Sequence, residues 1–322
     1  MLNVPTARIF PGGIIFFVIL FMSGCATLQT DRVRATAGAF PRPVELATVP
    51  FYPQEEYQCG PAALATALNW SGVPVTPEQL VSQVYLPERQ GSLQLEMIGA
   101  ARRHGRVPYV LRPELESLFA EVASGNPVLV LQNLSFWWYP KWHYAVVVGF
   151  DLPGDRIVLR SGREQRHDIP IELFERTWRR SRYWAMVVLP PDQLPFTAEE
   201  IPYVQAVAPL ERIARWPEAQ TAYAAALKHW PKSLGARMGL GNSRYALGDV
   251  TGSEEEFRRA AQEHPEAAAA FNNLAQALAD QKKWSQAQAA ARHAVELGGP
   301  QIETYRDTLK QIETRSEQNA AQ

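Results

Sequence analysis

Residues 58–64 carry the sequence Gln58-Cys59-Gly60-Pro61-Ala62-Ala63-Leu64. Cys59-Gly60-Pro61 is a turn signal, and the apolar residues that follow have the composition of a buried helix. Cys59 is thereby placed at a helix amino terminus, where unpaired backbone N–H groups and the helix dipole favour a thiolate over a thiol. Cys59 is therefore the candidate nucleophile. The alternative is a structural cysteine, since free cysteine is among the most buried residue types.

A candidate base for this cysteine lies downstream, in the stretch Trp142-His143-Tyr144-Ala145-Val146-Val147-Val148-Gly149-Phe150-Asp151. Its β-branched residues predict a buried strand that His143 opens. Residues 152–155 predict a turn, and residues 156–161 predict the returning strand of a hairpin. A histidine at a strand mouth is well placed to face a helix end, so His143 is the candidate general base that a cysteine nucleophile requires.

Residues 56–63 together with residues 143–151 resemble the papain-like fold of the bacteriocin-processing, double-glycine leader peptidases and their stand-alone relatives. The likeness covers roughly residues 47–190. It implies that Cys59 is the nucleophile, that His143 is the base, and that a glutamine shortly before the cysteine donates to the oxyanion. Gln54 fits this last role best, one residue closer to Cys59 than the family pattern, and Gln58 is the alternative.

The third member of the site departs from that family. Relatives end the second strand of the hairpin with Asp-Pro, in which the aspartate orients the histidine, whereas this chain has Ser161-Gly162. A serine hydroxyl can accept from an imidazole N–H but brings no negative charge. The candidates for the third residue are Ser161, Glu164 and Asp168, and an unassisted pair of cysteine and histidine is also open.

The remaining pattern up to residue 192 completes an α+β domain. Helices are predicted from Pro77, over residues 92–101 and over residues 115–124, and strands over residues 106–111, 127–131 and 183–189. Helices followed by a largely antiparallel sheet predict a papain-like cysteine peptidase domain over residues 47–192. The aromatic loop at residues 133–142 is expected to line a peptide cleft, to touch a membrane surface, or to pack over the sheet edge.

The amino terminus is predicted to be a targeting segment. The apolar core at residues 14–22 is short for a membrane span, and Met22-Ser23-Gly24-Cys25 resembles a bacterial lipobox. The resemblance implies cleavage before Cys25, lipid attachment to its sulfur and, with Ala26 following, an outer-membrane lipoprotein that faces the periplasm of a Gram-negative bacterium. A plain signal peptide or single-pass anchor is the alternative. Residues 26–46 show no periodicity and predict an extended linker.

The carboxy-terminal third repeats every 34 residues. The recurring positions are Ala219, Ser253 and Ala287; Tyr223, Phe257 and Ala291; and Ala226, Ala260 and Ala294. With Leu240-Gly241 and Tyr245-Ala246-Leu247-Gly248, the pattern resembles tetratricopeptide repeats. We expect an all-α tetratricopeptide-repeat domain over residues 193–316, with a cap helix at 301–316 and a disordered tail at 317–322. Such repeats imply a surface for a protein partner, unless they only brace the first domain.

Composition sets the limits on function. The chain has 322 residues, 46% hydrophobic content and a formal net charge of −1, so it is long enough for two domains and gives no reason to expect a nucleic-acid partner. No metal-ligand cluster, phosphate loop or dinucleotide fingerprint is recognisable, so neither metal nor cofactor is expected. Two functions remain: a membrane-anchored cysteine peptidase acting on a peptide or protein, and a scaffold lipoprotein whose peptidase-like domain binds a peptide tail without cutting it.

Overall fold

The computed structural model describes residues 29–35, 40, 42–54 and 58–320. The predicted signal peptide, its lipobox and Cys25 therefore lie outside the described residues, as do residues 55–57 just before the candidate nucleophile. None of the helices in the described ranges is both long enough and apolar enough to cross a bilayer.

A seven-stranded antiparallel sheet forms the centre of the first domain. The strands of its main path lie in the order β4-β9-β5-β6-β7-β8, and β1 pairs with β6. The bounds are β1 (Val44–Glu45), β4 (Val107–Val110), β5 (Val128–Asn133), β6 (Trp142–Asp151), β7 (Arg156–Ser161), β8 (Glu164–Pro170) and β9 (Ala185–Leu189). A separate small hairpin pairs β2 (Tyr85–Leu86) with β3 (Gly91–Ser92).

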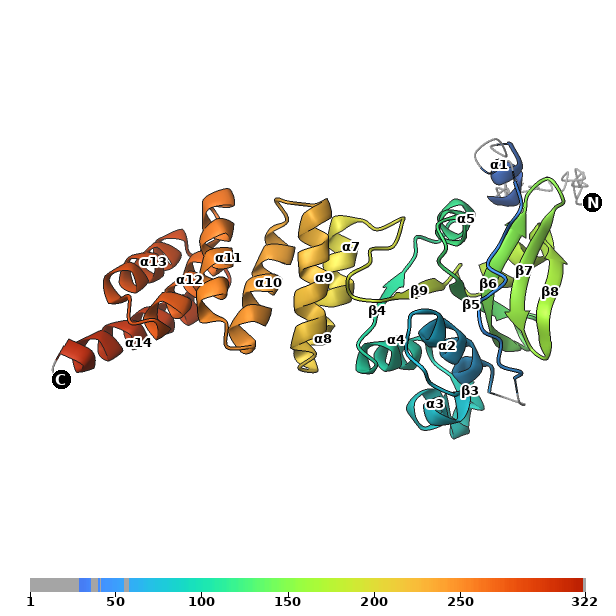
Figure 1. The fold of residues 1–322 in the computed structure, drawn as a ribbon, viewed down its shortest axis with the longest axis horizontal. Helices are drawn as coiled ribbons and strands as arrows, with labels where there is room; N and C mark the ends of the chain where they lie inside the picture. The colour runs from blue at the N-terminus through green and yellow to red at the C-terminus, as the bar shows by residue number, and fades with distance from the viewer. Residues whose placement is uncertain (1–28, 36–39, 41, 55–57, 321–322) are drawn as a thin grey trace, which may run out of the picture.

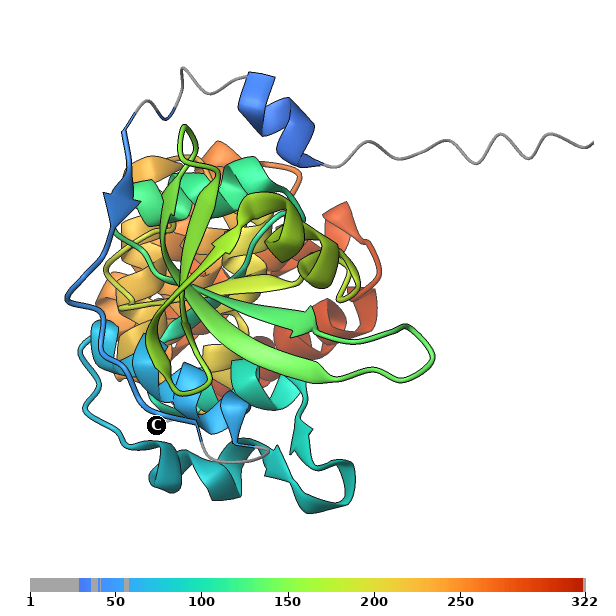
Figure 2. The same ribbon diagram turned by 90° about the vertical axis from the view of Figure 1, so that its right-hand side faces the viewer.

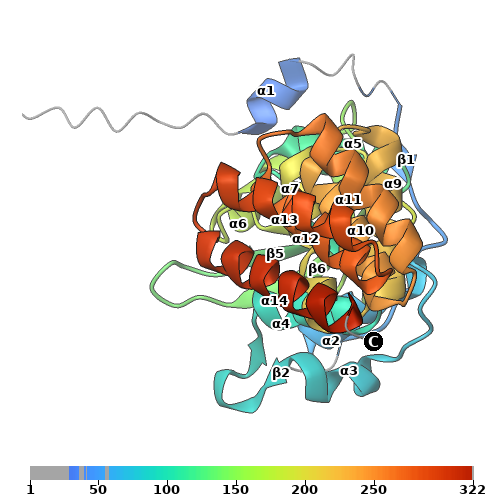
Figure 3. The same cartoon turned by 90° about the vertical axis from the view of Figure 1, so that its left-hand side faces the viewer.

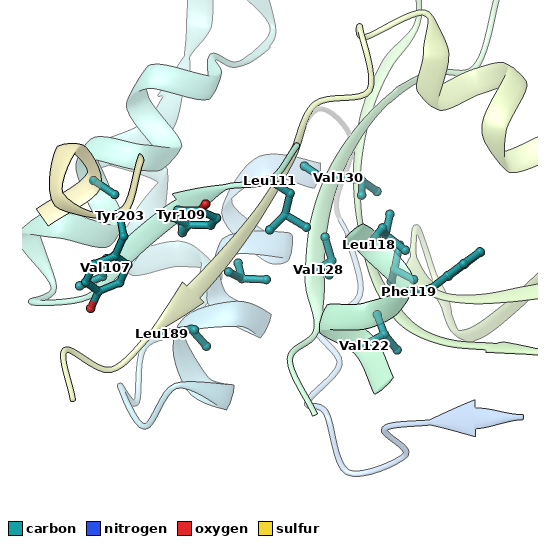
Figure 4. Packing of buried hydrophobic residues seen from close by; sticks show 14 of the residues in the cluster. Val107, Tyr109, Leu111, Leu118, Phe119, Val122, Val128, Val130, Leu189 and Tyr203 are labelled. Atoms are coloured by element: carbon teal, nitrogen blue, oxygen red, sulfur yellow. The ribbon is translucent and has the colours of Figure 1, made fainter. Parts of the chain in front are cut away.

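Helices cover both faces of this sheet. The helices before it are α2 (Cys59–Trp70), α3 (Pro77–Val84) and α4 (Gln94–Arg103), with the short 3-10 helix η2 (Pro87–Arg89); those within it are α5 (Leu115–Ala123) and α6 (Ile171–Arg179). Strand residues alternate between two cores, as the two-residue period of a strand requires. Leu129 and Leu131 join the core on the α2 side, whereas Val128 and Val130 pack toward α5 (Figure 4). The sheet is thus buried on both sides.

The linker predicted for residues 26–46 is not extended throughout. Gln29–Ala35 forms helix α1, which docks on α6. Val33 is buried in the main core, and the carboxylate of Glu175 accepts from the backbone N–H groups of Gln29, at 2.7 Å, and Thr30, at 2.8 Å. This distant carboxylate satisfies the orphan donors of the first turn, which explains a helix where the local sequence shows no periodicity.

The second part of the chain is a stack of helices: α7 (Glu200–Val207), α8 (Pro209–Arg212), α9 (Trp216–His229), α10 (Leu234–Ala246), α11 (Val250–Glu263), α12 (Ala268–Asp280), α13 (Trp284–Leu297) and α14 (Ile302–Ala320). All nine residues of the 34-residue pattern are buried. At Gly241 a side chain would overlap the ring of Phe257, so a glycine is needed for α10 and α11 to pack this closely. The predicted tail is helical as far as Ala320, because α14 continues past residue 316.

The two parts share one hydrophobic core. The cluster that contains Val107 and Tyr109 of β4 also contains Tyr203 of α7 and Tyr223 of α9. Figure 1 shows the helices stacking away from the sheet, with the carboxyl terminus at the end farthest from it. The repeats are therefore fixed to the first domain through packed side chains.

Candidate functional site

Cys59 is the first residue of α2, at the helix amino terminus that the sequence predicts. The backbone N–H groups of Tyr144, Gly60 and Cys59 itself lie near its sulfur, where they lower the pKa of the thiol. A side chain at position 60 would overlap the Ser92 hydroxyl of β3, so the glycine lets the β2–β3 hairpin lie against the helix start. Because Tyr144 follows His143 directly, the sulfur lies against the strand that carries the candidate base.

His143 is the second residue of β6 and is half-buried. Its Nε2 lies 2.8 Å from the Oγ of Ser161, the last residue of β7. Nε2 is thereby occupied, which leaves Nδ1 as the ring nitrogen for proton exchange with a thiol. The hydrogen bonds of the described residues include none that joins Cys59 to His143 directly.

Gln54 bridges the two strands of the hairpin where they separate. The last paired residues toward this end are Val146 of β6 and Arg160 of β7. Beyond them, the Gln54 N–H donates to the Gly162 carbonyl at 2.9 Å, and its Nε2 donates to the Tyr144 carbonyl at 3.3 Å. A side-chain amide has two N–H donors, so one remains for an oxyanion.

The other candidates named from the sequence are placed differently. Gln58 is the amino-cap residue of α2, and its side chain makes no capping hydrogen bond. Glu164 binds His167 Nδ1 at 2.8 Å, and Asp168 pairs with Arg166. Of Ser161, Glu164 and Asp168, the structure brings only Ser161 into hydrogen-bond contact with the ring of His143.

The charge state of the pair differs from the expectation based on the helix end. Burial raises the pKa of the Cys59 thiol, although the N–H groups of Tyr144, Gly60 and Cys59 oppose the shift. Burial also lowers the pKa of His143 to about 4, with smaller contributions from Lys141 and His167. Both groups are therefore neutral at pH 7. Desolvation outweighs the helix terminus at this position.

Two residues of the site have no signal in the sequence. Tyr144 contributes its backbone N–H to the sulfur and its carbonyl to Gln54, and its hydroxyl donates to the Ser92 carbonyl at 3.2 Å. The Ser92 Oγ is buried and has no hydrogen-bond partner among the described residues. Both depend on the approach of segments about 50 residues apart, which motif spacing does not report.

No group of three or more His, Cys, Asp or Glu side chains in the described part of the chain is arranged to hold a metal ion. Two cavities, of about 430 and 280 Å³, lie on the helical repeats rather than at Cys59. The larger is lined by Arg244, Glu255, Glu256, Arg258, Arg259 and Gln262.

Comparison with known proteins agrees with this architecture. Residues 46–186 match the Peptidase_C39 like family, and residues 210–265 and 240–301 match the tetratricopeptide repeat. The chain thus contains a C39-like peptidase domain followed by tetratricopeptide repeats, which confirms the predicted fold class of an α+β peptidase domain and an all-α repeat domain.

Among solved structures, a putative C39-like peptidase from Bacillus anthracis is similar at 17% identity, covering 46% of this chain and 97% of that one, with a TM-score of 0.39. The type III secretion translocator chaperone SycD of Yersinia enterocolitica is similar at 16% identity, covering 36% and 83%, with a TM-score of 0.34. No curated protein matches the chain.

Proposed function

We propose that the C39-like domain is a cysteine peptidase that hydrolyses a peptide bond through Cys59 and His143. The observation that carries the proposal is the arrangement around Tyr144. Its N–H lies near the Cys59 sulfur and opposes the rise in the thiol pKa, and its carbonyl accepts a hydrogen bond from the Gln54 amide. Nucleophile, base and oxyanion donor are thereby gathered around two consecutive residues of one strand, which is the grouping that acyl transfer requires.

The chemistry follows from the neutral state of the pair. As the Cys59 sulfur attacks the substrate carbonyl carbon, its proton passes to His143, which is unprotonated at neutral pH and can accept it. The Gln54 amide and the Cys59 N–H donate to the oxyanion. His143 then gives the proton to the leaving amine, and water hydrolyses the thioester with His143 again as base.

A second candidate function is favoured by one observation. Ser161, the partner of His143, carries no charge with which to stabilise an imidazolium, and burial further opposes that cation. A domain that binds a peptide without cutting it needs no imidazolium. This is the scaffold alternative, in which the surface around Cys59 holds a peptide tail.

Cleavage and labelling distinguish the two functions. The chain from Ala26 onward, which keeps every described residue, is incubated with a proteome-derived peptide library and, separately, with a set of peptidyl vinyl sulfones. New amino termini and a covalent adduct on Cys59 are expected for the parent. Both should be lost in Cys59→Ala and reduced by at least about a hundredfold in His143→Ala.

His104→Ala is the matched control, since His104 lies at the end of α4 and bonds Gln83 rather than any residue of the site. Its cleavage rate should equal that of the parent. If the parent yields neither new amino termini nor an adduct but still retains peptides from the library, the domain is a peptide-binding scaffold and not a peptidase.

Location and partners are part of the same proposal. We propose that Cys25 is acylated and that the mature chain is an outer-membrane lipoprotein facing the periplasm. The repeats would hold a protein partner, as tetratricopeptide repeats generally do. Metabolic labelling with a palmitate analogue tests the anchor. We expect label on the parent but not on Cys25→Ala. We also expect the parent, and not the variant, to sediment with the outer-membrane fraction.

A further inference from the structure

The loop between β5 and β6 holds a cluster of aromatic rings away from the domain. Phe136, Trp137, Trp138 and Tyr139 are all exposed, with Trp137 at 81% and Tyr139 at 75%. The Phe136 and Trp138 rings stack with their centroids 4.7 Å apart. Large contiguous apolar patches are rare on protein surfaces and generally mark an interaction site, so this loop is a candidate for one.

Asn133 braces this loop from inside. Its side-chain carbonyl accepts from the N–H groups of Ser135 and Lys141, each at 3.0 Å, and its amide donates to the Phe136 carbonyl at 3.3 Å. The Leu134 N–H also donates to the Lys141 carbonyl at 2.9 Å. The rings are thus held on a structured hairpin that projects from the domain beyond α6 (Figure 2).

A basic surface adjoins the base of the loop. α6 and the turn after it expose Arg176, Arg179, Arg180 and Arg182, and Arg180 donates to the Asn133 carbonyl at 3.0 Å. The acidic residues of α6 cancel this charge only at Arg176. Glu172 is paired with Arg176 alone, and the carboxylate of Glu175 is buried under α1. Arginines and aromatic rings therefore lie side by side.

Helix α1 connects this surface to the predicted lipid anchor. α1 begins at Gln29 and docks on α6, so only residues 26–28 separate it from Cys25. Four residue steps span at most about 14 Å. A lipid on Cys25 would therefore hold the start of α1 within that distance of the headgroups, and α6 next to it, instead of at the end of a linker of about 20 residues. Figure 3 shows α1, then α6, then the projecting loop, one below the other along one side of the molecule.

We infer that the aromatic loop and the α6 arginines form a membrane-contact face that binds the surface of an anionic bilayer. Tryptophan and tyrosine are the residues that concentrate at membrane interfaces, and exposed arginines are attracted to anionic headgroups. The bilayer is favoured over a peptide as occupant by the charge and the aromatic composition of this face, and by the tether length, which rests on the proposed acylation of Cys25. Binding by this face requires neither peptidase activity nor acylation, and the lipid anchor only brings it into contact.

Vesicle binding by the chain from Ala26 onward, which has no lipid, tests this face by itself. The probe is extruded phosphatidylethanolamine vesicles with about one quarter phosphatidylglycerol, and neutral phosphatidylcholine vesicles are the comparison. We expect the parent to sediment with the anionic vesicles and to be released by salt. Trp137→Ser with Trp138→Ser, and separately Arg179→Glu with Arg182→Glu, should each lower the partition coefficient by about tenfold or more.

Two matched pairs on the repeat side serve as controls. Phe196 and Ile201 are similarly exposed apolar residues, and Lys228 and Lys232 are exposed cations. Phe196→Ser with Ile201→Ser, and separately Lys228→Glu with Lys232→Glu, should leave binding within about twofold of the parent. A parent that stays in the supernatant overturns the inference. So do loop variants that bind vesicles normally but raise KM for a cleaved peptide, since the rings would then line the substrate cleft.

Discussion

At the scale of single residues, the burial of His143 sets the acid response of the fold. The unfolded chain binds a proton at His143 near its ordinary pKa of 6.5, whereas the folded chain binds it near pH 4. The unfolded state therefore holds more protons between these values, and the free energy of unfolding falls as pH drops from about 6.5 to about 4. His143 is only half-buried, so we expect the loss to be on the order of 2 kcal/mol.

Ser161→Asp should reverse much of that response. A carboxylate at the position of the hydroxyl stabilises the imidazolium and raises the pKa of His143 by at least about one unit. The loss of stability on acidification then becomes smaller, and alkylation of Cys59 near pH 7 becomes faster. Urea denaturation at pH 7 and pH 4.5, with an NMR titration of the ring, measures both effects. Ser161→Asn keeps an acceptor without charge and should behave like the parent; equal shifts in both variants would contradict the electrostatic explanation.

Local patterns predicted Cys59 at a helix start and His143 on a hairpin strand, whereas Gln54 and Ser161 were named from the resemblance to the leader peptidases. The charge state was not predictable in the same way. A helix terminus is visible in the sequence, but the burial that raises the pKa of Cys59 comes from the surrounding elements. The role of the Tyr144 backbone has the same origin, since a main-chain donor has no sequence signature.

At the scale of elements, the sequence located the strands and helices whose apolar period is strong, and failed where an element is held by tertiary contacts. β8 carries mostly exposed polar residues at the sheet edge, so it shows no alternation. α6, by contrast, has a local signal in the amphipathic period of Ile171, Phe174 and Trp178. α1 is different in kind: its capping carboxylate, Glu175, lies 146 residues from Gln29, beyond any local pattern.

Glu175→Gln should release α1. The replacement puts an NH₂ group where backbone N–H donors converge, so at least one buried donor loses its acceptor. We expect the opening equilibrium of residues 29–35 to rise by about tenfold to a hundredfold. The readout is tryptic cleavage after Arg32 and Arg34, supported by amide hydrogen exchange. Glu172→Gln, on the same helix but in an exposed pair with Arg176, is the control and should leave cleavage slow. Equal protection in both variants would show that α1 does not depend on Glu175.

At the scale of the whole molecule, the peptidase-like domain and the repeats are joined without a flexible linker. The Tyr109 hydroxyl accepts from the Glu199 N–H at 3.2 Å, and Glu121 accepts from the Thr197 N–H at 2.7 Å. Tyr203 is fully buried, with its ring 6.4 Å from that of Tyr109. A partner held on the repeats would thus have a fixed position relative to Cys59, which suits presentation of a particular segment of that partner to the site.

Tyr203→Ala should destabilise both parts together. Removing a buried aromatic side chain costs about 3–5 kcal/mol, and this ring belongs to a core that contains residues of both parts. Unfolding of the first domain can be followed by pulse alkylation of Cys59, the single thiol after Ala26, and that of the repeats by helical circular dichroism. Both urea midpoints should fall in Tyr203→Ala. Leu278→Ala removes a buried side chain from a separate cluster of the later repeats, so it should lower the dichroism midpoint and leave the Cys59 midpoint unchanged. If Tyr203→Ala moves the dichroism midpoint alone, the repeats unfold independently and cannot hold a partner in a fixed position over the site.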